Sequence, residues 1–200
     1  LEIRPRSGSP GRYPLREMSD GGRIAAALMI AAALSGAAGC AAPIPAREGE
    51  RYPVPGHGSS VEAPGGEGAA WTLASVPGAL LTFRGVAGST AEHASMSLVE
   101  RCAAAPGQPR LAARQLLIGL DDREFLEDRP CEVGGTTGWL QSLEASDEAV
   151  RVHLRTVTRL ESGCSLDWIL VAPPGAGLDA AFDAWWASWS RDRETSGASP

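Results

Sequence analysis

The strongest constraint on the fold of this chain is a stretch of alternating side chains that begins at residue 150. Along residues 150–160, every second residue is apolar or a threonine, and most of the residues between them are basic. A repeat of two residues is typical of a β-strand with one face on a core. The expected core face carries Val150, Val152, Leu154, Thr156, Thr158 and Leu160, and the other face carries Arg151, His153, Arg155, Val157 and Arg159.

A second apolar run follows after a short link that contains Gly163. Glycine can adopt the left-handed backbone conformation that a tight hairpin loop needs. The two runs are therefore predicted to pair as an antiparallel hairpin, with Leu160 opposite Leu166. In this register Arg159 faces Asp167, so that apolar side chains meet apolar ones and opposite charges meet.

Apolar periodicity predicts further elements of the same domain, which we place at residues 70–191. Short alternating or apolar runs predict strands at 71–74, 80–84, 95–101 and 139–145. The charged stretch 121–129 is ambiguous and could contain an exposed edge strand near 124–126. Apolar residues at three- and four-residue spacing predict helices at 109–120 and 178–189. The predicted fold class is therefore α+β, an antiparallel sheet of about five to six strands packed with two helices.

The N-terminal part of the chain indicates export. Residues 1–17 show no pattern and are expected to be an upstream extension, with Met18 as the initiator. Residues 18–39 have the form of a signal peptide, with Arg23, an apolar run of about 11 residues and then small residues. That run is too short for a membrane-spanning helix, which needs about 20 residues.

Ala38, Gly39 and Cys40 resemble the lipobox of bacterial lipoproteins, in which the cysteine is acylated and begins the mature chain. Ala37 departs from this pattern, because leucine is usual three places before the cysteine. The alternative is an ordinary secretory signal cut near Ala38, which would leave Cys40 a plain thiol. The resemblance implies an anchor in the membrane through acylated Cys40, facing the periplasm, and Ala41 favours the outer membrane.

The segments on either side of the predicted domain are poor in residues that could pack. Residues 40–69 are rich in proline, glycine, alanine and glutamate, and are predicted to be a flexible tether. Within it, residues 52–54 could form a short strand or a contact onto the domain. Residues 192–200 are expected to be a disordered tail. The formal net charge of -6 argues against a nucleic-acid partner, because binding to phosphates needs a basic surface.

Three cysteines lie in the predicted domain, namely Cys102, Cys131 and Cys164. For an exported chain a disulfide is expected. We favour Cys102–Cys164, since both lie at strand ends or in turns, while a bridge from Cys131 to either of them, or no bridge, stays open. No Cys-x-x-Cys and no cysteine and histidine cluster with zinc-site spacing occurs, so neither a metal nor a cofactor is predicted.

An envelope hydrolase with an unrecognised active site is the alternative function. A nucleophile, a base and an orienting acid could come from Ser95 or Ser97, His93 and Asp167. No Gly-x-Ser-x-Gly motif accompanies these residues, and scattered residues of such common types are expected by chance. His153 is interpreted as an ordinary strand residue.

Arg151, Arg155 and Arg159 line one face of the predicted strand. They could contact an anionic ligand or a lipid headgroup. The more ordinary interpretation is a solvated face that pairs with acids such as Asp167 and Glu144.

Trp185, Trp186 and Trp189 lie in the second predicted helix. They could form a hydrophobic surface for a partner, although packing into the core is the more ordinary interpretation. Two consecutive tryptophans cannot both point squarely inward, so one of them is expected at the surface.

The order of these elements resembles the fold shared by Mog1 and the PsbP photosystem proteins, an antiparallel sheet covered by helices. The resemblance spans residues 71–190 and rests on Trp71 and on residues 80–83, 96–99, 167–171 and 182–189. The chain also resembles uncharacterised proteobacterial lipoproteins with this layout. That fold hosts no single chemistry, so the resemblance implies no active site. We therefore predict a membrane-anchored envelope lipoprotein that acts as a non-catalytic binding or accessory module for an envelope transport or assembly complex.

Overall fold

The computed structural model describes residues 44–65, 70–87, 92–102, 107–147 and 150–191. The predicted extension, the signal peptide, Cys40 and the tail 192–200 lie outside these residues. None of the described helices has the length and the apolar character needed to cross a membrane. The described helices are α2 (Pro109–Gln115) and α3 (Asp179–Ala187), and the strands are β1 (Ile44–Pro45), β2 (Arg51–Val54), β3 (Ser59–Glu62), β4 (Ala70–Ala74), β5 (Ala79–Ala87), β6 (Glu92–Arg101), β7 (Asp121–Val133), β8 (Thr136–Asp147), β9 (Val150–Glu161), β10 (Cys164–Ala172) and β11 (Ser190–Arg191).

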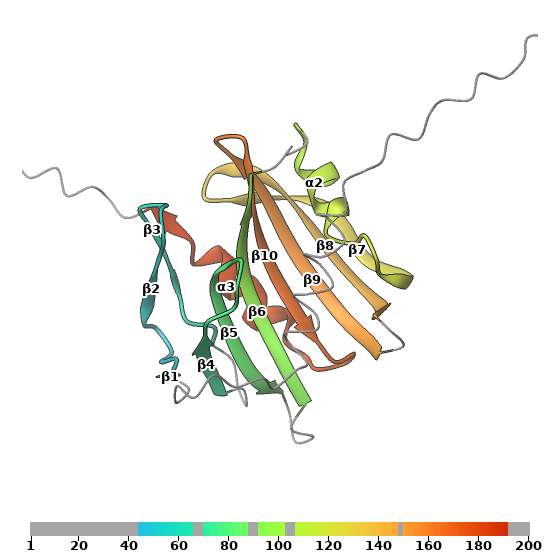
Figure 1. The fold of residues 1–200 in the computed structure, drawn as a ribbon, viewed down its shortest axis with the longest axis horizontal. Helices are drawn as coiled ribbons and strands as arrows, with labels where there is room; N and C mark the ends of the chain where they lie inside the picture. The colour runs from blue at the N-terminus through green and yellow to red at the C-terminus, as the bar shows by residue number, and fades with distance from the viewer. Residues whose placement is uncertain (1–43, 66–69, 88–91, 103–106, 148–149, 192–200) are drawn as a thin grey trace, which may run out of the picture.

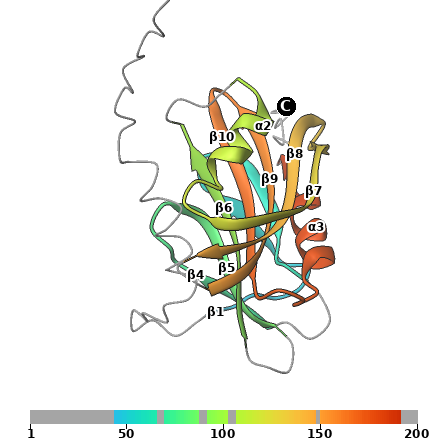
Figure 2. The same cartoon turned by 90° about the vertical axis from the view of Figure 1, so that its right-hand side faces the viewer.

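A large antiparallel sheet forms the body of the protein, in the strand order β1-β4-β5-β6-β10-β9-β8-β7. Strands β11, β3 and β2 form a smaller sheet. Helix α2 lies on one side of the large sheet, and α3 lies on the other side (Figures 1 and 2). The α+β class with two helices on an antiparallel sheet is confirmed. The expected number of strands was too low, because β1 and β7 add an edge strand on each side of the predicted ones.

Both faces of the predicted hairpin are buried, which corrects the expectation of a single core face. From β10, Trp168 and Leu170 point into the core beneath α3, which also contains Phe182. The alternate residues Ile169 and Val171 point into a second core, beneath α2. A strand that is buried on both faces is typically a continuous apolar run, which is the pattern that residues 168–172 show.

The register of the hairpin differs by one residue from the predicted one. Leu166 lies opposite Arg159, and Asp167 lies opposite Thr158. The connection is a two-residue turn, Ser162 and Gly163, with φ of 51° and 82°. Positive φ at both positions is characteristic of the type I′ turn, whose twist matches that of the flanking strands. A shift of one residue exchanges the two faces of a strand relative to its partner, so the predicted Arg159–Asp167 contact is wrong.

The predicted flexible tether is also wrong for residues 44–65, while the possible short strand at residues 52–54 is confirmed as part of β2. Val54, Val61 and Ala63 from this stretch are buried in the core beneath α3. Arg51 connects the small sheet to the residue that follows α3, because its guanidinium donates to the carbonyl oxygen of Ser188. Proline and glycine are frequent here because the turns of a small sheet require them, and not because the chain is unstructured.

Candidate functional site

Two cysteines from neighbouring strands meet at one end of the large sheet. Strands β6 and β10 are antiparallel neighbours, and Ser165 lies opposite Arg101. The next residues along each strand, Cys102 and Cys164, are therefore side by side, and they form a disulfide across a sequence separation of 62. The predicted Cys102–Cys164 bridge is confirmed.

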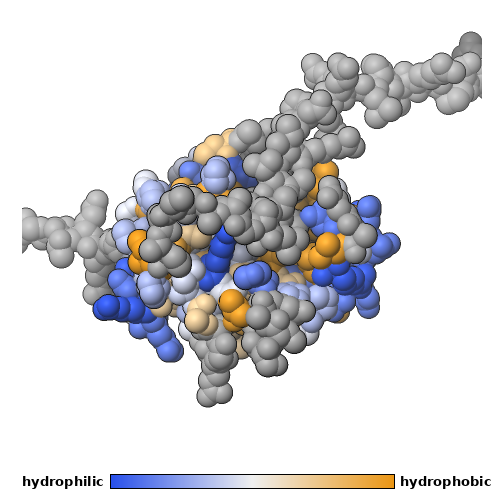
Figure 3. All heavy atoms as spheres, turned by 60° about the horizontal axis from the view of Figure 1, so that its bottom comes forward, coloured by the Kyte–Doolittle hydropathy of each residue, from blue (hydrophilic) through white to orange (hydrophobic). Residues whose placement is uncertain are grey.

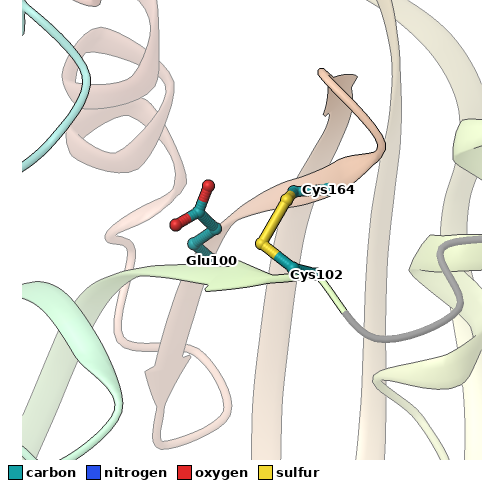
Figure 4. A group of neighbouring side chains, drawn as sticks. All are labelled: Glu100, Cys102 and Cys164. Atoms are coloured by element: carbon teal, nitrogen blue, oxygen red, sulfur yellow. A yellow bond between two sulfur atoms is a disulfide. The ribbon is translucent and has the colours of Figure 1, made fainter.

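A carboxylate and an imidazole lie beside this bridge. Glu100 precedes Cys102 by two residues on β6, so the two side chains share a face of the sheet. A carboxylate oxygen of Glu100 and the two Sγ atoms all lie within 4.8 Å of one another (Figure 4). Nε2 of His57 lies 3.5 Å from Oε1 of Glu100. We call these four residues, Glu100, Cys102, Cys164 and His57, the cysteine cluster.

Three separate parts of the chain build the cysteine cluster. His57 comes from the turn between β2 and β3, where its backbone N–H donates to the carbonyl oxygen of Val54. The His57 ring also meets the edge of the Trp189 ring, with centroids 6.2 Å apart. The His57 side chain is 13% exposed and the Glu100 side chain is 32% exposed, while Cys102 is exposed. The cluster therefore packs against Trp189 through His57, and its disulfide bridge is open to solvent at Cys102.

Cys131, the third cysteine of the domain, is a free thiol and is half-buried. Burial raises the pKa of Cys131 to about 11, while Arg129 lowers that pKa and Asp183 raises it. The thiolate is the form that attacks a disulfide, so Cys131 is a poor nucleophile near neutral pH.

Reduction of the Cys102–Cys164 bridge is expected to lower the free energy of unfolding by about 3–4 kcal/mol, because the bridge restricts the unfolded chain over a long loop. The measurement is urea unfolding with and without a phosphine reductant. A Cys131→Ser variant is the control, since it should respond to the reductant as the parent chain does. An unfolding midpoint that stays the same after complete reduction would show that the bridge contributes no stability.

The predicted arginine face is largely covered rather than solvated. Arg155 is buried, and its guanidinium donates to both carboxylate oxygens of Asp183 on α3, at 3.0 and 2.8 Å, and to Glu127 at 2.7 Å. Burial alone would lower the pKa of Arg155, but Asp183, Glu127 and Asp179 raise it above its ordinary value. The arginine is used to hold α3 against the sheet, so it is not available to an anionic ligand.

The other two arginines of this face have different environments. Arg159 is buried, donates to Glu161, and lies over the Trp189 ring with Cζ 5.4 Å from the centroid. Arg151 is exposed and pairs with Glu144 and Glu124, at 3.2 and 3.4 Å. The solvated interpretation therefore fits Arg151, and it fails for Arg159 because α3 and the residues after it cover that end of the strand.

The three tryptophans of α3 and the residues after it do not form one exposed surface. Trp185 and Trp189 are buried in the core, and Trp185 contacts the edge of Phe83 with ring centroids 6.0 Å apart. Trp186 is half-buried, and its indole N–H donates to Asp183. The interpretation as a partner surface is therefore corrected for Trp185 and Trp189, which point toward the sheet.

The residues proposed for a hydrolase do not come together. Asp167 accepts hydrogen bonds from Arg101, Thr158 and Ser165. On the neighbouring strand its register partner is Val99. The proposed base His93 is six residues from Val99 on β6, which corresponds to about 20 Å along a strand, so Asp167 cannot orient it. His153, which the sequence indicates as an ordinary strand residue, contacts Asp179 on α3 at 2.8 Å. These contacts hold elements together, and they do not orient a base toward a serine.

A second charged cluster lies between α2 and β7. Asp128 accepts hydrogen bonds from Trp139 and Gln141 on β8, at 2.5 and 3.1 Å, and from Arg114 on α2, at 2.7 Å. Burial alone would raise the pKa of Asp128, but these donors lower it from its ordinary 3.8 to about 2. Arg110 also donates to Asp128, at 3.3 Å, and its Cζ lies 5.1 Å from the centroid of the Trp139 ring. The cluster joins the helix to the edge of the sheet.

Asp128 is expected to make stability depend on pH below about 4. Its pKa is lower in the folded chain, so its contribution is complete above the unfolded pKa and is lost as the pH falls toward about 2. An Asp128→Asn variant should be less stable than the parent at pH 7, and it should lose less stability between pH 7 and pH 3. Urea unfolding at the two pH values measures both effects. Equal losses in the two chains would contradict the assignment.

Large apolar side chains are exposed at several separate places. On the face shown in Figure 3, hydrophobic residues form separate orange groups among hydrophilic ones. Across the described residues, the exposed large apolar side chains are Ile44, Val86, Leu111, Ile118, Phe125, Leu126 and Val150. Two of these flank Arg114 along α2 and the turn that follows it, and the Arg114 guanidinium lies over the Phe125 ring at 5.1 Å.

No protein-family model matches the chain, and no curated protein matches it. Among solved structures, the chain is similar to a protein of unknown function from Pseudomonas aeruginosa, with 17% identity, 70% of this chain and 92% of that chain covered, and a TM-score of 0.43. It is also similar to the cyanobacterial PsbP protein CyanoP of Synechocystis sp. PCC 6803, with 15% identity, coverage of 79% and 98%, and a TM-score of 0.48. A third similar structure, from Bacteroides thetaiotaomicron VPI-5482, has 12% identity, coverage of 74% and 50%, and a TM-score of 0.46. Similarities with identities and TM-scores of this size carry no argument about the fold, so its description rests on the observed strand order.

Proposed function

We propose that this protein is a lipoprotein of the bacterial cell envelope, anchored through acylated Cys40 and facing the periplasm, with the outer membrane as its site. Its folded domain acts as a non-catalytic binding or accessory module of an envelope transport or assembly complex, with a Mog1/PsbP-like layout. The lipobox-like residues Ala38, Gly39 and Cys40 support the anchor.

The observation that carries the envelope location is the Cys102–Cys164 bridge. Structural disulfides persist in oxidising compartments and are rare in the cytoplasm. A bridge that closes a long loop and has an exposed sulfur would be reduced in the cytoplasm. Export by the predicted signal peptide places the chain where the bridge is stable.

The use of the interior charges supports a module rather than a hydrolase. Arg101 and Arg155 each connect the sheet to a helix, through the Ala112 carbonyl oxygen on α2 and the Asp183 carboxylate on α3. These groups already have strong partners within the fold. Charged groups arranged in this way fix the position of the helices, which is what a binding surface requires.

Fractionation of cells tests the anchor. The chain expressed from Met18 should be found in the membrane fraction and should be released by detergent. A Cys40→Ser variant should be found in the soluble fraction, while a Cys131→Ser control should behave as the parent chain does. A Cys40→Ser variant that stays in the membrane would disprove the lipoprotein assignment.

Crosslinking in cells tests the binding role. A photoreactive residue in place of Leu111, which is 51% exposed on α2, should capture one defined envelope protein. The same residue in place of the exposed Glu132 on β7 serves as the control. Capture that is the same at both positions, or that does not depend on Cys40, would contradict a specific partner in the envelope.

A further inference from the structure

We propose that reduction of the Cys102–Cys164 bridge converts the cysteine cluster into a binding site for a divalent cation of the zinc type. Cys102 and Cys164 supply two thiolates and Glu100 supplies a carboxylate oxygen, and these three residues already lie together. His57, whose Nε2 lies beside Glu100, supplies the fourth ligand once the bridge has opened. The proposal does not depend on the envelope role proposed above, because it rests on the cluster alone.

The chemistry of the four donors fits such an ion. Zinc binds thiolate sulfur, imidazole nitrogen and carboxylate oxygen, usually four of them in a tetrahedron. Two thiolates favour zinc and other borderline or soft cations over magnesium and calcium, which prefer oxygen ligands. The cluster contains two sulfurs, one nitrogen and one carboxylate, and it has no neighbouring run of acids that would indicate a calcium site.

The distances among Glu100, Cys102 and Cys164, and between His57 and Glu100, are already close to those of a metal centre. With zinc–ligand bonds of about 2.0–2.3 Å, two ligands of one tetrahedral zinc lie roughly 3.3–3.8 Å apart. Nε2 of His57 and Oε1 of Glu100 are 3.5 Å apart. The Glu100 carboxylate and the two Sγ atoms lie within 4.8 Å of one another. The bonded sulfurs are too close together for two ligands of one ion, and reduction removes this restriction. His57 does not belong to the group within 4.8 Å, so the freed cysteine side chains must turn toward its Nε2 when the ion binds.

The fold keeps the backbones that carry the four donors in place after the bridge opens. Cys102 and Cys164 flank the paired strands β6 and β10, whose ladder continues through Ser165 and Arg101. His57 is fixed by its turn and by the Trp189 ring. Because Cys102 is exposed, a reductant can reach the bridge and a cation can enter from solvent. The oxidised form closes the site, so the redox state would control cation binding.

The reduction of the bridge and the binding of the cation are both balanced in atoms and electrons. A dithiol reductant attacks one sulfur of the bridge, the Cys102–Cys164 bond breaks, both cysteines become thiols, and the reductant leaves as its own disulfide. The cation then displaces one proton from each thiol, and two metal–thiolate bonds form. Glu100 binds as a carboxylate and His57 binds in its neutral form, so neither of them is oxidised or reduced.

Cobalt(II) is the probe, since its absorbance reports tetrahedral geometry and thiolate ligands. The protein is the full chain with Cys40→Ser and Cys131→Ser, so that Cys102 and Cys164 are its remaining cysteines. After reduction by a phosphine, which is oxidised to its oxide by oxygen from water, we expect one cobalt ion per chain with a thiolate charge-transfer band. The oxidised chain should show no such band.

Ligand variants test the assignment of the four residues. Cys164→Ser should abolish the charge-transfer band of a bis-thiolate site. Glu100→Gln and His57→Ala should each weaken cobalt binding at least about tenfold, which is the lower end of what the loss of a supporting group costs. The matched controls Glu132→Gln and His93→Ala should leave the affinity unchanged. Equal affinity in all four of the glutamate and histidine variants would overturn the site.

A stability measurement keeps the proposal testable if the reduced chain folds poorly. A cation that binds the folded form raises the unfolding midpoint. Zinc should therefore raise the thermal midpoint of the reduced chain, or restore its circular dichroism, and it should leave the oxidised chain unchanged. No effect of zinc on the reduced chain, or an equal effect on the oxidised chain, would overturn the proposal.

Discussion

Replacing Arg101 with methionine is expected to lower the free energy of unfolding by about 3–5 kcal/mol. Nε of Arg101 donates to Oδ2 of the fully buried Asp167 at 2.7 Å. Methionine keeps the apolar volume but leaves the carboxylate with Thr158 and Ser165 as its remaining described donors. The hydrogen bond from Arg101 to the Ala112 carbonyl oxygen is lost as well, which loosens α2. Urea unfolding at neutral pH measures the effect.

Two further variants separate the buried charge from the loss of an arginine as such. Arg151→Met removes exposed ion pairs with Glu144 and Glu124, so it should cost at most about 1 kcal/mol. The double variant Arg101→Met with Asp167→Asn should recover part of the loss, because no unpaired carboxylate stays buried. If Arg101→Met costs no more than Arg151→Met, the Arg101–Asp167 pair does not stabilise the fold as described.

Replacing Trp168 with alanine is expected to destabilise the chain by about 3–5 kcal/mol. The Trp168 side chain is fully buried at the centre of the large sheet, between Leu98 on β6 and Val157 on β9. Its ring meets the edge of the Trp189 ring, with centroids 5.2 Å apart. Alanine would leave a cavity that the rigid strands on both sides cannot close. Thermal or urea unfolding, together with the near-ultraviolet circular dichroism of the tryptophans, reports the loss.

Trp186→Ala is the matched control for this substitution. Trp186 belongs to the same core region but is half-buried, so its removal leaves a smaller cavity and water can occupy part of the space. The expected loss of stability is clearly smaller than for Trp168. A double variant of Trp168 and Trp189 should lose less than the sum of the two single losses, because the two rings share one contact. Equal losses for Trp168→Ala and Trp186→Ala would contradict the described core.

The strands and helices with a strong periodicity were predictable from the sequence. The alternating residues 150–160 form β9, and the continuous apolar run after them forms β10. The second predicted helix, 178–189, corresponds to α3 (Asp179–Ala187). The predicted helix at 109–120 is shorter, since α2 ends at Gln115. Side-chain spacing is a property of the local chain, so these elements required no knowledge of distant contacts.

The charged edge of the sheet carried a weaker signal. Residues 121–129 could be interpreted as an exposed edge strand near 124–126, and the observed strand β7 is much longer, Asp121–Val133. Register shifts between Asp121 and Glu124, and between Phe125 and Glu127, interrupt its pairing with β8. Bulges and charged side chains are common on edge strands, where they discourage pairing with other chains. They also disturb the two-residue repeat by which a strand is recognised.

The alternating pattern did not reveal that the arginine face is covered by other parts of the chain. A two-residue repeat shows which residues share a face, and it does not show what covers that face. Arg155 is buried because Asp183 on α3 comes to lie against it, 28 residues later in the chain. Ion pairs of this kind depend on long-range packing, so the pattern of residues 150–160 was compatible with a solvated face.

In the candidate site, too, some residues could be predicted from the sequence and others could not. The position of two cysteines at strand ends was sufficient to predict the Cys102–Cys164 bridge. His57 was missed, because its surroundings read as a tether and its sequence neighbours include none of the cluster residues. The cluster residue that the sequence could have indicated was Glu100, because a spacing of two residues places it on the same strand face as Cys102.

The sequence by itself determined the alternation of β9, the apolar character of β10, the amphipathic helix α3 and the export-type N-terminal pattern. The tertiary structure alone decided the hairpin register, the covering of the arginine face and the meeting of His57 with Glu100. The physical reason is that spacing and turn chemistry act over a few residues. Which buried groups become partners is instead set by the free energy of packing both sheet faces at once.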